Sequence, residues 1–209
     1  MSVLFFVFII LIFLNLPLHF LSVNHTKLED IFGKKKGLTI GKLLGMISGW
    51  GFFIYLFGLW FSPQPRFYIP FILNYRIFIP FTNLIITELN IILSIPFILL
   101  SIWLGIEGVK ATTLKVSETH YTDKIVKDDI YSIIRHPQYL GAILAHIGFS
   151  ILLSASYSLL STILIIFYNY LVSWKEEKEL IKEYGHDYLE YKKKVPMFIP
   201  NICKLMINN

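Results

Sequence analysis

An arginine and a histidine stand directly before a proline in the run Arg135-His136-Pro137-Gln138-Tyr139-Leu140-Gly141. Proline favours the first turn of a helix, where its missing N–H would have no partner in any case. That helix would direct the positive end of its dipole, with Arg135 and His136 beside it, toward a carboxylate or phosphate. The alternative is that Arg135 only anchors the helix at a membrane surface.

His146 lies seven residues beyond Tyr139, so both side chains would lie close to one face of the same helix. It is the only readily ionisable group well inside this apolar stretch, and polar groups at such depth usually face a cavity or a partner. The sequence leaves open whether His146 contacts a ligand or is a packing histidine whose hydrogen bonds are satisfied within the protein.

Two adjacent carboxylates, Glu176 and Glu177, follow the next apolar stretch. The C-terminus of a helix favours cations rather than anions. We therefore expect one helix to continue beyond the membrane, with both carboxylates near the boundary, where they face a cationic or hydroxyl-rich ligand. The alternative is a solvated charged face with Glu–Lys pairs, and we assign Glu179 to that face.

The segment 184–200 combines three tyrosines, a glycine, the lysine cluster 192–194 and an apolar strand bounded by prolines. This composition predicts a structured tail that folds back over the start of the preceding hairpin. Lysines at this position are typical of contact with anionic lipid headgroups.

Composition identifies the elements that must position these groups. The chain has 209 residues, of which 55% are hydrophobic and 16% charged, and its mean hydropathy is +0.62; soluble domains carry about 25% charged residues. Charged side chains are absent from 1–26 and again from 136–174, and such lengths match a bilayer. We expect an all-α, polytopic membrane helix bundle of about five transmembrane helices, ending in a helical hairpin and a cytoplasmic tail.

The five expected spans are 3–21, 40–61 and 84–106, followed by a hairpin of 139–153 and 158–174 around Ser154-Ala155-Ser156-Tyr157. The first run has no positively charged start and no small-residue cleavage site, so we expect a retained span rather than a signal peptide. The segment 67–81 is interrupted by prolines and polar residues, and we expect it to be interfacial or re-entrant. We divide the chain into membrane spans 1–110 and a cofactor-binding region 111–209, with the hairpin at 137–174.

The net charge of +5 raises the possibility of nucleic-acid binding, but the distribution of charge favours a membrane role. With five spans, all of the 19 basic residues except Arg66 and Arg76 fall on one side. The positive-inside rule then places the N-terminus outside and the C-terminus in the cytoplasm. Four glycines at intervals of four, Gly37, Gly41, Gly45 and Gly49, predict close helix packing, either inside the monomer, which we favour, or in a dimer.

Taken together, the three polar stretches resemble the isoprenylcysteine carboxyl methyltransferase family and its phospholipid N-methyltransferase relatives. The shared pattern is Arg-His-Pro-x-Tyr-x-Gly, a helical hairpin, Glu-Glu, and a Tyr-Gly-x-x-Tyr-x-x-Tyr-Lys-x-x-Val-Pro-x-x-Ile-Pro tail, and it covers about 123–200. The first hundred residues are similar only in being hydrophobic. Asp129 stands where the family often has glycine, so the turn there is expected to differ.

The resemblance implies S-adenosylmethionine as methyl donor, a pocket capped by the cytoplasmic tail, and a lipid or prenylated acceptor that enters from the bilayer. It implies positioning roles for Arg135 and His146 and a cofactor site made by Arg135, His136, Pro137, Tyr139, Gly141, Glu176, Glu177 and Tyr188, with His120 as a weaker candidate. No Gly-x-Gly-x-x-Gly turn indicates a Rossmann domain, and no Cys/His cluster indicates a metal site.

The acceptor remains open among several classes. A prenylcysteine carboxylate, which the tail motif favours, needs a cationic partner but no deprotonation. A phosphatidylethanolamine amine needs a base, for which His146 and Asp129 are candidates, and a small thiol is a further possibility. Outside methyl transfer, membrane sterol reductases that use NADPH have related motifs, and the glycine stripe would also suit a non-enzymatic scaffold.

Overall fold

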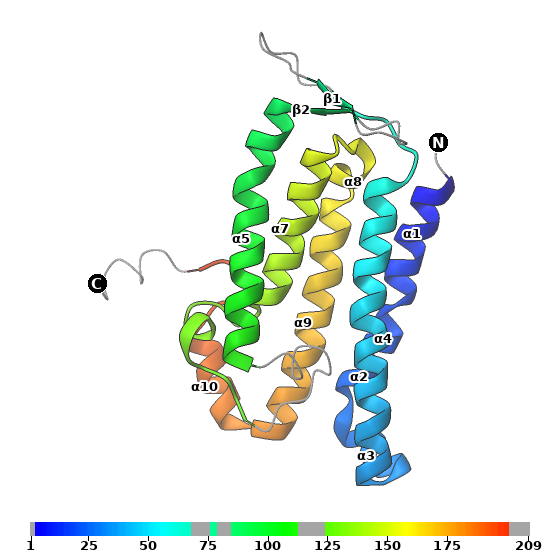
Figure 1. The fold of residues 1–209 in the computed structure, drawn as a ribbon. Helices are drawn as coiled ribbons and strands as arrows, with labels where there is room; N and C mark the ends of the chain where they lie inside the picture. The colour runs from blue at the N-terminus through cyan, green and yellow to red at the C-terminus, as the bar shows by residue number, and fades with distance from the viewer. Residues whose placement is uncertain (1–2, 68–75, 79–84, 113–123, 201–209) are drawn as a thin grey trace, which may run out of the picture.

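The computed structural model describes residues 3–67, 76–78, 85–112 and 124–200, which are mostly helical. Long helices run side by side, with strands β1 and β2 at one end of the bundle and helices α3 and α10 at the other (Figure 1). In chain order the elements are α1 Val3–Leu14, α2 Leu16–Val23, α3 His25–Phe32, α4 Lys34–Phe61, β1 Arg76–Phe78, β2 Ile85–Thr87, α5 Glu88–Thr112, the 3-10 helix η1 Asp129–Ser132, α7 Pro137–Leu152, α8 Ser156–Leu160, α9 Thr162–Tyr184 and α10 His186–Lys194.

Within the described ranges, three segments are long and apolar enough to cross a membrane: α1 together with α2, α4, and α5. Helix α7 is apolar but shorter, and α9 joins an apolar first half to a charged second half. Large apolar side chains such as Ile54, Leu99 and Ile163 are exposed, as suits a surface that contacts lipid. The predicted all-α membrane bundle is confirmed, although the third span is shifted, because 85–87 are strand and the helix begins at Glu88.

Glycines allow the helices to approach closely at two places. A Cβ on Gly37 would lie 2.5 Å from the backbone of Leu28, and a Cβ on Gly41 would lie 3.2 Å from the carbonyl oxygen of Ser22. This part of the glycine stripe therefore packs inside the monomer, as we favoured. Between α5 and α7, a Cβ on Gly141 would lie 3.2 Å from the carbonyl oxygen of Ser101, which explains why a small residue is needed there.

Helices α7 and α9 form the predicted hairpin. Pro137 occupies the first turn of α7, and the chain reverses through Leu153-Ser154-Ala155 before the short α8. The guanidinium of Arg66 supports this turn, since its Nη1 donates a 2.9 Å hydrogen bond to the carbonyl of Leu153. Helix α9 then runs unbroken to Tyr184, which confirms that one helix carries Glu176 and Glu177 past the apolar stretch.

The predicted interfacial segment 67–81 lies largely outside the described residues. Its described part, Arg76–Phe78, is strand β1, which pairs antiparallel with β2 so that Ile77 lies opposite Ile86. Both strands lie at the end of the bundle away from α10 (Figure 1).

Candidate active site

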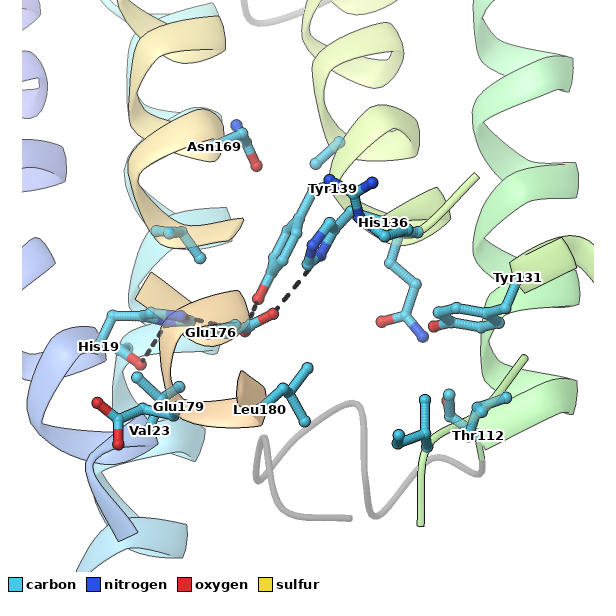
Figure 2. A pocket seen from close by; sticks show the side chains of 18 of the residues that line it. His19, Val23, Thr112, Tyr131, His136, Tyr139, Asn169, Glu176, Glu179 and Leu180 are labelled. Atoms are coloured by element: carbon cyan, nitrogen blue, oxygen red, sulfur yellow. Dashed lines mark hydrogen bonds and ion pairs between the residues drawn. The ribbon is translucent and has the colours of Figure 1, made fainter. Parts of the chain in front are cut away.

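A cavity of about 230 Å³ opens among α2, α4, α7, α9, α10 and the chain that follows residue 123. Residues from both predicted regions of the chain, 1–110 and 111–209, line this cavity. His19 of α2 and Phe52 of α4 come from the first region, and Tyr139, Glu176 and Tyr188 come from the second. Figure 2 shows His19 on one side of the cavity and Tyr139 on the other, with Glu176 between them.

Glu176 is the centre of a polar cluster in the cavity wall. The hydroxyl of Tyr139 donates a hydrogen bond to Oε1, and the Nε2 atom of His19 lies 3.3 Å from the same oxygen. Nδ1 of His136 lies 3.7 Å from Oε2. Side chains from two helices and from the residue that precedes α7 thus surround one carboxylate, which keeps 15% of its side-chain surface exposed toward the cavity (Figure 2).

Glu177, although adjacent in sequence, has a different environment. Its side chain is 1% exposed and is not part of the cavity lining. Nε and Nη2 of Arg135 each lie 2.7 Å from its Oε1, and Nζ of Lys192 lies 2.6 Å from its Oε2. Burial alone would raise the pKa of Glu177, but hydrogen bonds from His136, Lys192 and Arg135 lower it to about 2. Glu177 is therefore a buried anion that joins α9 to α10 and to the start of α7.

The C-terminal tail binds at the start of α7, where the sequence predicts a binding site for a carboxylate or phosphate. The backbone N–H groups of Arg135 and His136 donate to the carbonyls of Pro196 and Met197, at 2.9 and 3.2 Å. Nη1 of Arg135 also donates to the carbonyls of Lys192 and Val195. Backbone oxygens of the chain itself thus bind these donors. The predicted structured tail that folds back is confirmed.

His146 lies away from the cavity. It is fully buried; its Nδ1 accepts a 3.1 Å hydrogen bond from Nε1 of Trp60, and its Nε2 lies 2.8 Å from the carbonyl of Ser158. These contacts match the alternative of a packing histidine. Pro137 and Gly141 are also buried outside the cavity lining, whereas Tyr188 lines it. His120 lies outside the described residues.

Asp129 opens η1 with φ of +51°, in the left-handed region that favours glycine. This geometry explains why the position suits glycine, and aspartate is one of the few other residues that adopt it. Whether the turn differs from that of the family stays a prediction. Its side chain is exposed and does not line the cavity.

Glu179 is a correction to the sequence-based expectation. It is 4% exposed rather than solvated, it lines the cavity, and its Oε1 pairs with Lys175 and Lys182 at 2.7 and 2.8 Å. The reason is that Lys175 also donates to Oδ1 of Asn24, which packs the turn between α2 and α3 against this face of α9. Its spacing of three residues from Glu176 was the available signal, because such residues share a helix face.

Sequence reasoning also missed His19 and Asn169. The signal for His19 was a lone histidine in a charge-free span. Asn169 is 1% exposed and lies seven residues before Glu176, about 10 Å along the helix. Its Nδ2 donates to the carbonyl of Ile165, while its Oδ1 accepts no hydrogen bond from another described residue and points toward the cavity (Figure 2).

The cavity consequently has two different ends. Glu176 and Glu179 line one part of it with carboxylates, whereas Phe52, Ala142 and Val172, which pack in one apolar cluster, line the other. A cationic or hydroxyl-bearing group suits the first end, and a hydrocarbon chain with one hydrogen-bond donor suits the second.

Comparison with known proteins adds independent information. Residues 89–187 match the model of the family described as phospholipid methyltransferase. Protein-S-isoprenylcysteine O-methyltransferase of Schizosaccharomyces pombe is 38% identical over 103 residues, 46% of this chain and 41% of that protein. The enzymes of the same name from Saccharomyces cerevisiae and Xenopus laevis are 41% and 37% identical over 86 residues, 37% of this chain in both cases and 33% and 27% of those proteins.

The aligned region spans less than half the length of each of these relatives. No solved structure matches the chain. The matched residues include the Arg-His-Pro run, the hairpin and the Glu-Glu pair, whereas α2 and α4, which supply the opposite wall of the cavity, lie outside 89–187.

Proposed function

Because residues 89–187 match the model of the phospholipid methyltransferase family, we propose that this chain transfers a methyl group from S-adenosylmethionine to a lipid-like acceptor of the isoprenylcysteine carboxylate class. The observation that carries the proposal is the carboxylate of Glu176, which faces a cavity with one polar and one apolar end inside a bundle of membrane helices. Both ligands of such a reaction would find a matching environment in one enclosure.

The polar end fits the donor. S-adenosylmethionine carries a sulfonium, an ammonium and two ribose hydroxyls, and each of these is attracted to a carboxylate or donates to one. Glu176 is available for this role, with His136 and Tyr139 beside it. A second carboxylate, Glu179, has its Oε1 engaged by lysines, while its buried Oε2 has no hydrogen-bond partner among the described residues. These groups would hold the donor by its cationic and hydroxyl groups.

Arg135 and Glu177 contribute to the site in another way in this proposal. Because the guanidinium is bound to Glu177 and to tail carbonyls, Arg135 acts by fixing the wall that the tail and α10 form. Tyr188 belongs to the same wall. When bound, the donor supplies an electrophilic methyl group. The residues of this chain align the two reactants and exclude water, which lowers the barrier of an in-line displacement without a nucleophilic side chain.

The apolar end fits the hydrocarbon chain of the acceptor. Phe53 lines the cavity and is also 46% exposed on the outer surface of α4, where lipid would lie. We infer an acceptor that is held by its chain near α4 and directs its reacting group toward Glu176. The lysines near α3 and α10 lie at one end of the bundle and would meet anionic headgroups with the C-terminus in the cytoplasm (Figure 1).

Isothermal titration calorimetry of detergent-purified protein with S-adenosylmethionine tests the donor, with NADPH as the competing cofactor. We expect binding of S-adenosylmethionine that Glu176→Gln weakens and the exposed control Glu190→Gln leaves unchanged. Incorporation of labelled methyl groups into N-acetyl-farnesylcysteine or phosphatidylethanolamine then tests the acceptor. Binding of NADPH alone would overturn the proposal, and methylation of phosphatidylethanolamine alone would overturn its acceptor.

A further inference from the structure

His19 is a polar residue in an otherwise apolar part of the chain, and it lies in the wall of the cavity. It belongs to α2, which is outside the residues that match the family, and it is 3% exposed. Its Nε2 lies 3.3 Å from Oε1 of Glu176, its Nδ1 lies 3.5 Å from Oγ of Ser48, and its ring meets that of Tyr139 edge to face at 6.5 Å. Figure 2 shows the imidazole between α4 and α9 with its contact to Glu176.

The two ring nitrogens of His19 contact different elements. Nε2 of His19 lies at an ion-pair distance of 3.3 Å from Oε1 of Glu176, although the contact falls outside hydrogen-bond geometry. A carboxylate only accepts, so a proton on Nε2 makes this contact favourable. Oγ of Ser48 lies 3.1 Å from the carbonyl of Gly45, and the single hydroxyl proton satisfies that carbonyl. Nδ1 of His19 lies 3.5 Å from the same hydroxyl oxygen, and the direction of this contact depends on the tautomer of His19. The imidazole therefore faces Glu176 of α9 with Nε2 and contacts Ser48 of α4 with Nδ1.

We propose that His19 is a positioning residue of the donor subsite, which keeps the carboxylate of Glu176 turned toward the cavity. This inference rests on the proposed function. Without His19, Glu176 would retain the hydrogen bond from Tyr139 and the longer contact to His136, both from the α7 side. The carboxylate would lose its contact with His19 from the N-terminal side, which helps to hold the orientation that binding requires. The donor subsite thus includes an element that the family region does not contain.

A double-mutant cycle separates this role from a general effect on the fold. Affinity for S-adenosylmethionine is measured by calorimetry for the unchanged protein, His19→Leu, Glu176→Gln and the double variant. We expect His19→Leu to weaken binding about tenfold in the unchanged background and less than about threefold beside Glu176→Gln, because contacting residues show coupled effects. His19→Gln, which retains an N–H donor, should restore part of the affinity.

The matched control is Ser22→Ala, since Ser22 is buried on the same helix, its hydroxyl donates to the carbonyl of His19, and it does not line the cavity. Thermal unfolding midpoints report the folding of every variant, and His19→Phe replaces His19→Leu if the latter does not fold. Equal losses in both backgrounds, or no loss at all, would overturn the role of His19 while leaving the proposed function intact. Failure of the unchanged protein to bind S-adenosylmethionine would instead refute the proposed function.

Discussion

The two ends of the α7–α9 hairpin contain similar residue types in opposite circumstances. At the turn, Arg66 donates to the carbonyl of Leu153. His146 accepts from the indole N–H of Trp60 and contacts the carbonyl of Ser158, so groups of the protein itself meet its hydrogen-bonding needs. At the other end, Arg135 and His136 meet two carboxylates beside a cavity. The difference is that His136 contacts a carboxylate that lines the cavity, whereas His146 contacts Trp60 and Ser158, which do not line it.

The largest effect should come from removing the cation of the buried pair. Arg135→Met leaves the carboxylate of Glu177 buried with fewer partners, and the tail carbonyls lose the hydrogen bonds from Arg135. Removing one partner of a buried ion pair lowers the free energy of unfolding by about 3–5 kcal/mol. We expect a strongly lowered thermal unfolding midpoint in detergent. The control Lys193→Met removes an exposed partner of Glu190 and should change the midpoint little. An unchanged midpoint in Arg135→Met would show that the two ends of the hairpin do not differ in this way.

Acid should weaken the same end of the hairpin. The pKa of Glu177 falls from its ordinary value of 4.5 to about 2 in the folded protein. A lowered pKa contributes stability that is fully present above pH 4.5 and is lost as the pH falls toward 2. We expect Glu177→Gln to be less stable at neutral pH and to lose less of its stability between pH 5 and pH 3, measured by thermal unfolding. Parallel curves would contradict this assignment.

Exchanging one polar group at each end should separate binding from stability. Glu176→Gln should weaken binding of S-adenosylmethionine at least about tenfold with a small change in unfolding, because hydrogen bonds to charged groups are worth about 1.5–3 kcal/mol. His146→Phe should do the opposite, since it leaves Trp60 Nε1 buried without its acceptor at a cost of about 1–3 kcal/mol. For both variants, calorimetry measures the affinity for S-adenosylmethionine and thermal unfolding measures the stability. If His146→Phe lost affinity for S-adenosylmethionine while its unfolding midpoint stayed unchanged, His146 would belong to the donor site.

A smaller effect is expected at the apolar end of the cavity. Gly49 lines the cavity, and a Cβ added there meets nothing within 4 Å, so Gly49→Leu narrows the cavity without a clash at the backbone. We expect turnover of long-chain acceptors to fall more than that of short-chain ones, with unchanged affinity for S-adenosylmethionine. Gly105→Leu is the matched control, since it has equal space but lies outside the cavity lining. If Gly49→Leu turned over long-chain and short-chain acceptors equally well, the hydrocarbon chain of the acceptor would not lie beside Gly49.

The smallest effect should follow from Asp129→Gly. Glycine adopts a φ of +51° without steric cost, but it also gains freedom in the unfolded chain. The two effects oppose each other, and we expect a change of less than about 1 kcal/mol in stability, with unchanged donor binding. A large loss would mean that the carboxylate of Asp129 makes a contact that matters.

The helical architecture could be predicted from the sequence because length and apolar runs determine it directly. The start of α7 at Pro137 and the continuation of α9 through Glu176 follow from the proline and from the placement of charges, and both are confirmed. The roles of neighbouring carboxylates could not be predicted. Adjacent residues point about 100° apart on a helix, and which of Glu176 and Glu177 faces the cavity depends on where α10 and the tail pack.

The same limit applies to residues distant in sequence. His19 meets Glu176 only because the first helices pack against α9, and no local pattern in either segment records that contact. Glu179 was assigned to solvent because its lysine neighbours are typical of an exposed face. The contact between Asn24 and Lys175 buries it instead. Tertiary packing therefore determines the site, while local sequence determines the elements.

The hydrogen bond between Asn24 and Lys175 joins residues 151 positions apart. Because Lys175 belongs to α9, this contact can form only in a chain that already includes α9. A chain that ends before α9 lacks Glu176 and Glu179 and therefore one wall of the cavity. The proposed binding of S-adenosylmethionine therefore requires a molecule in which both walls of the cavity are assembled.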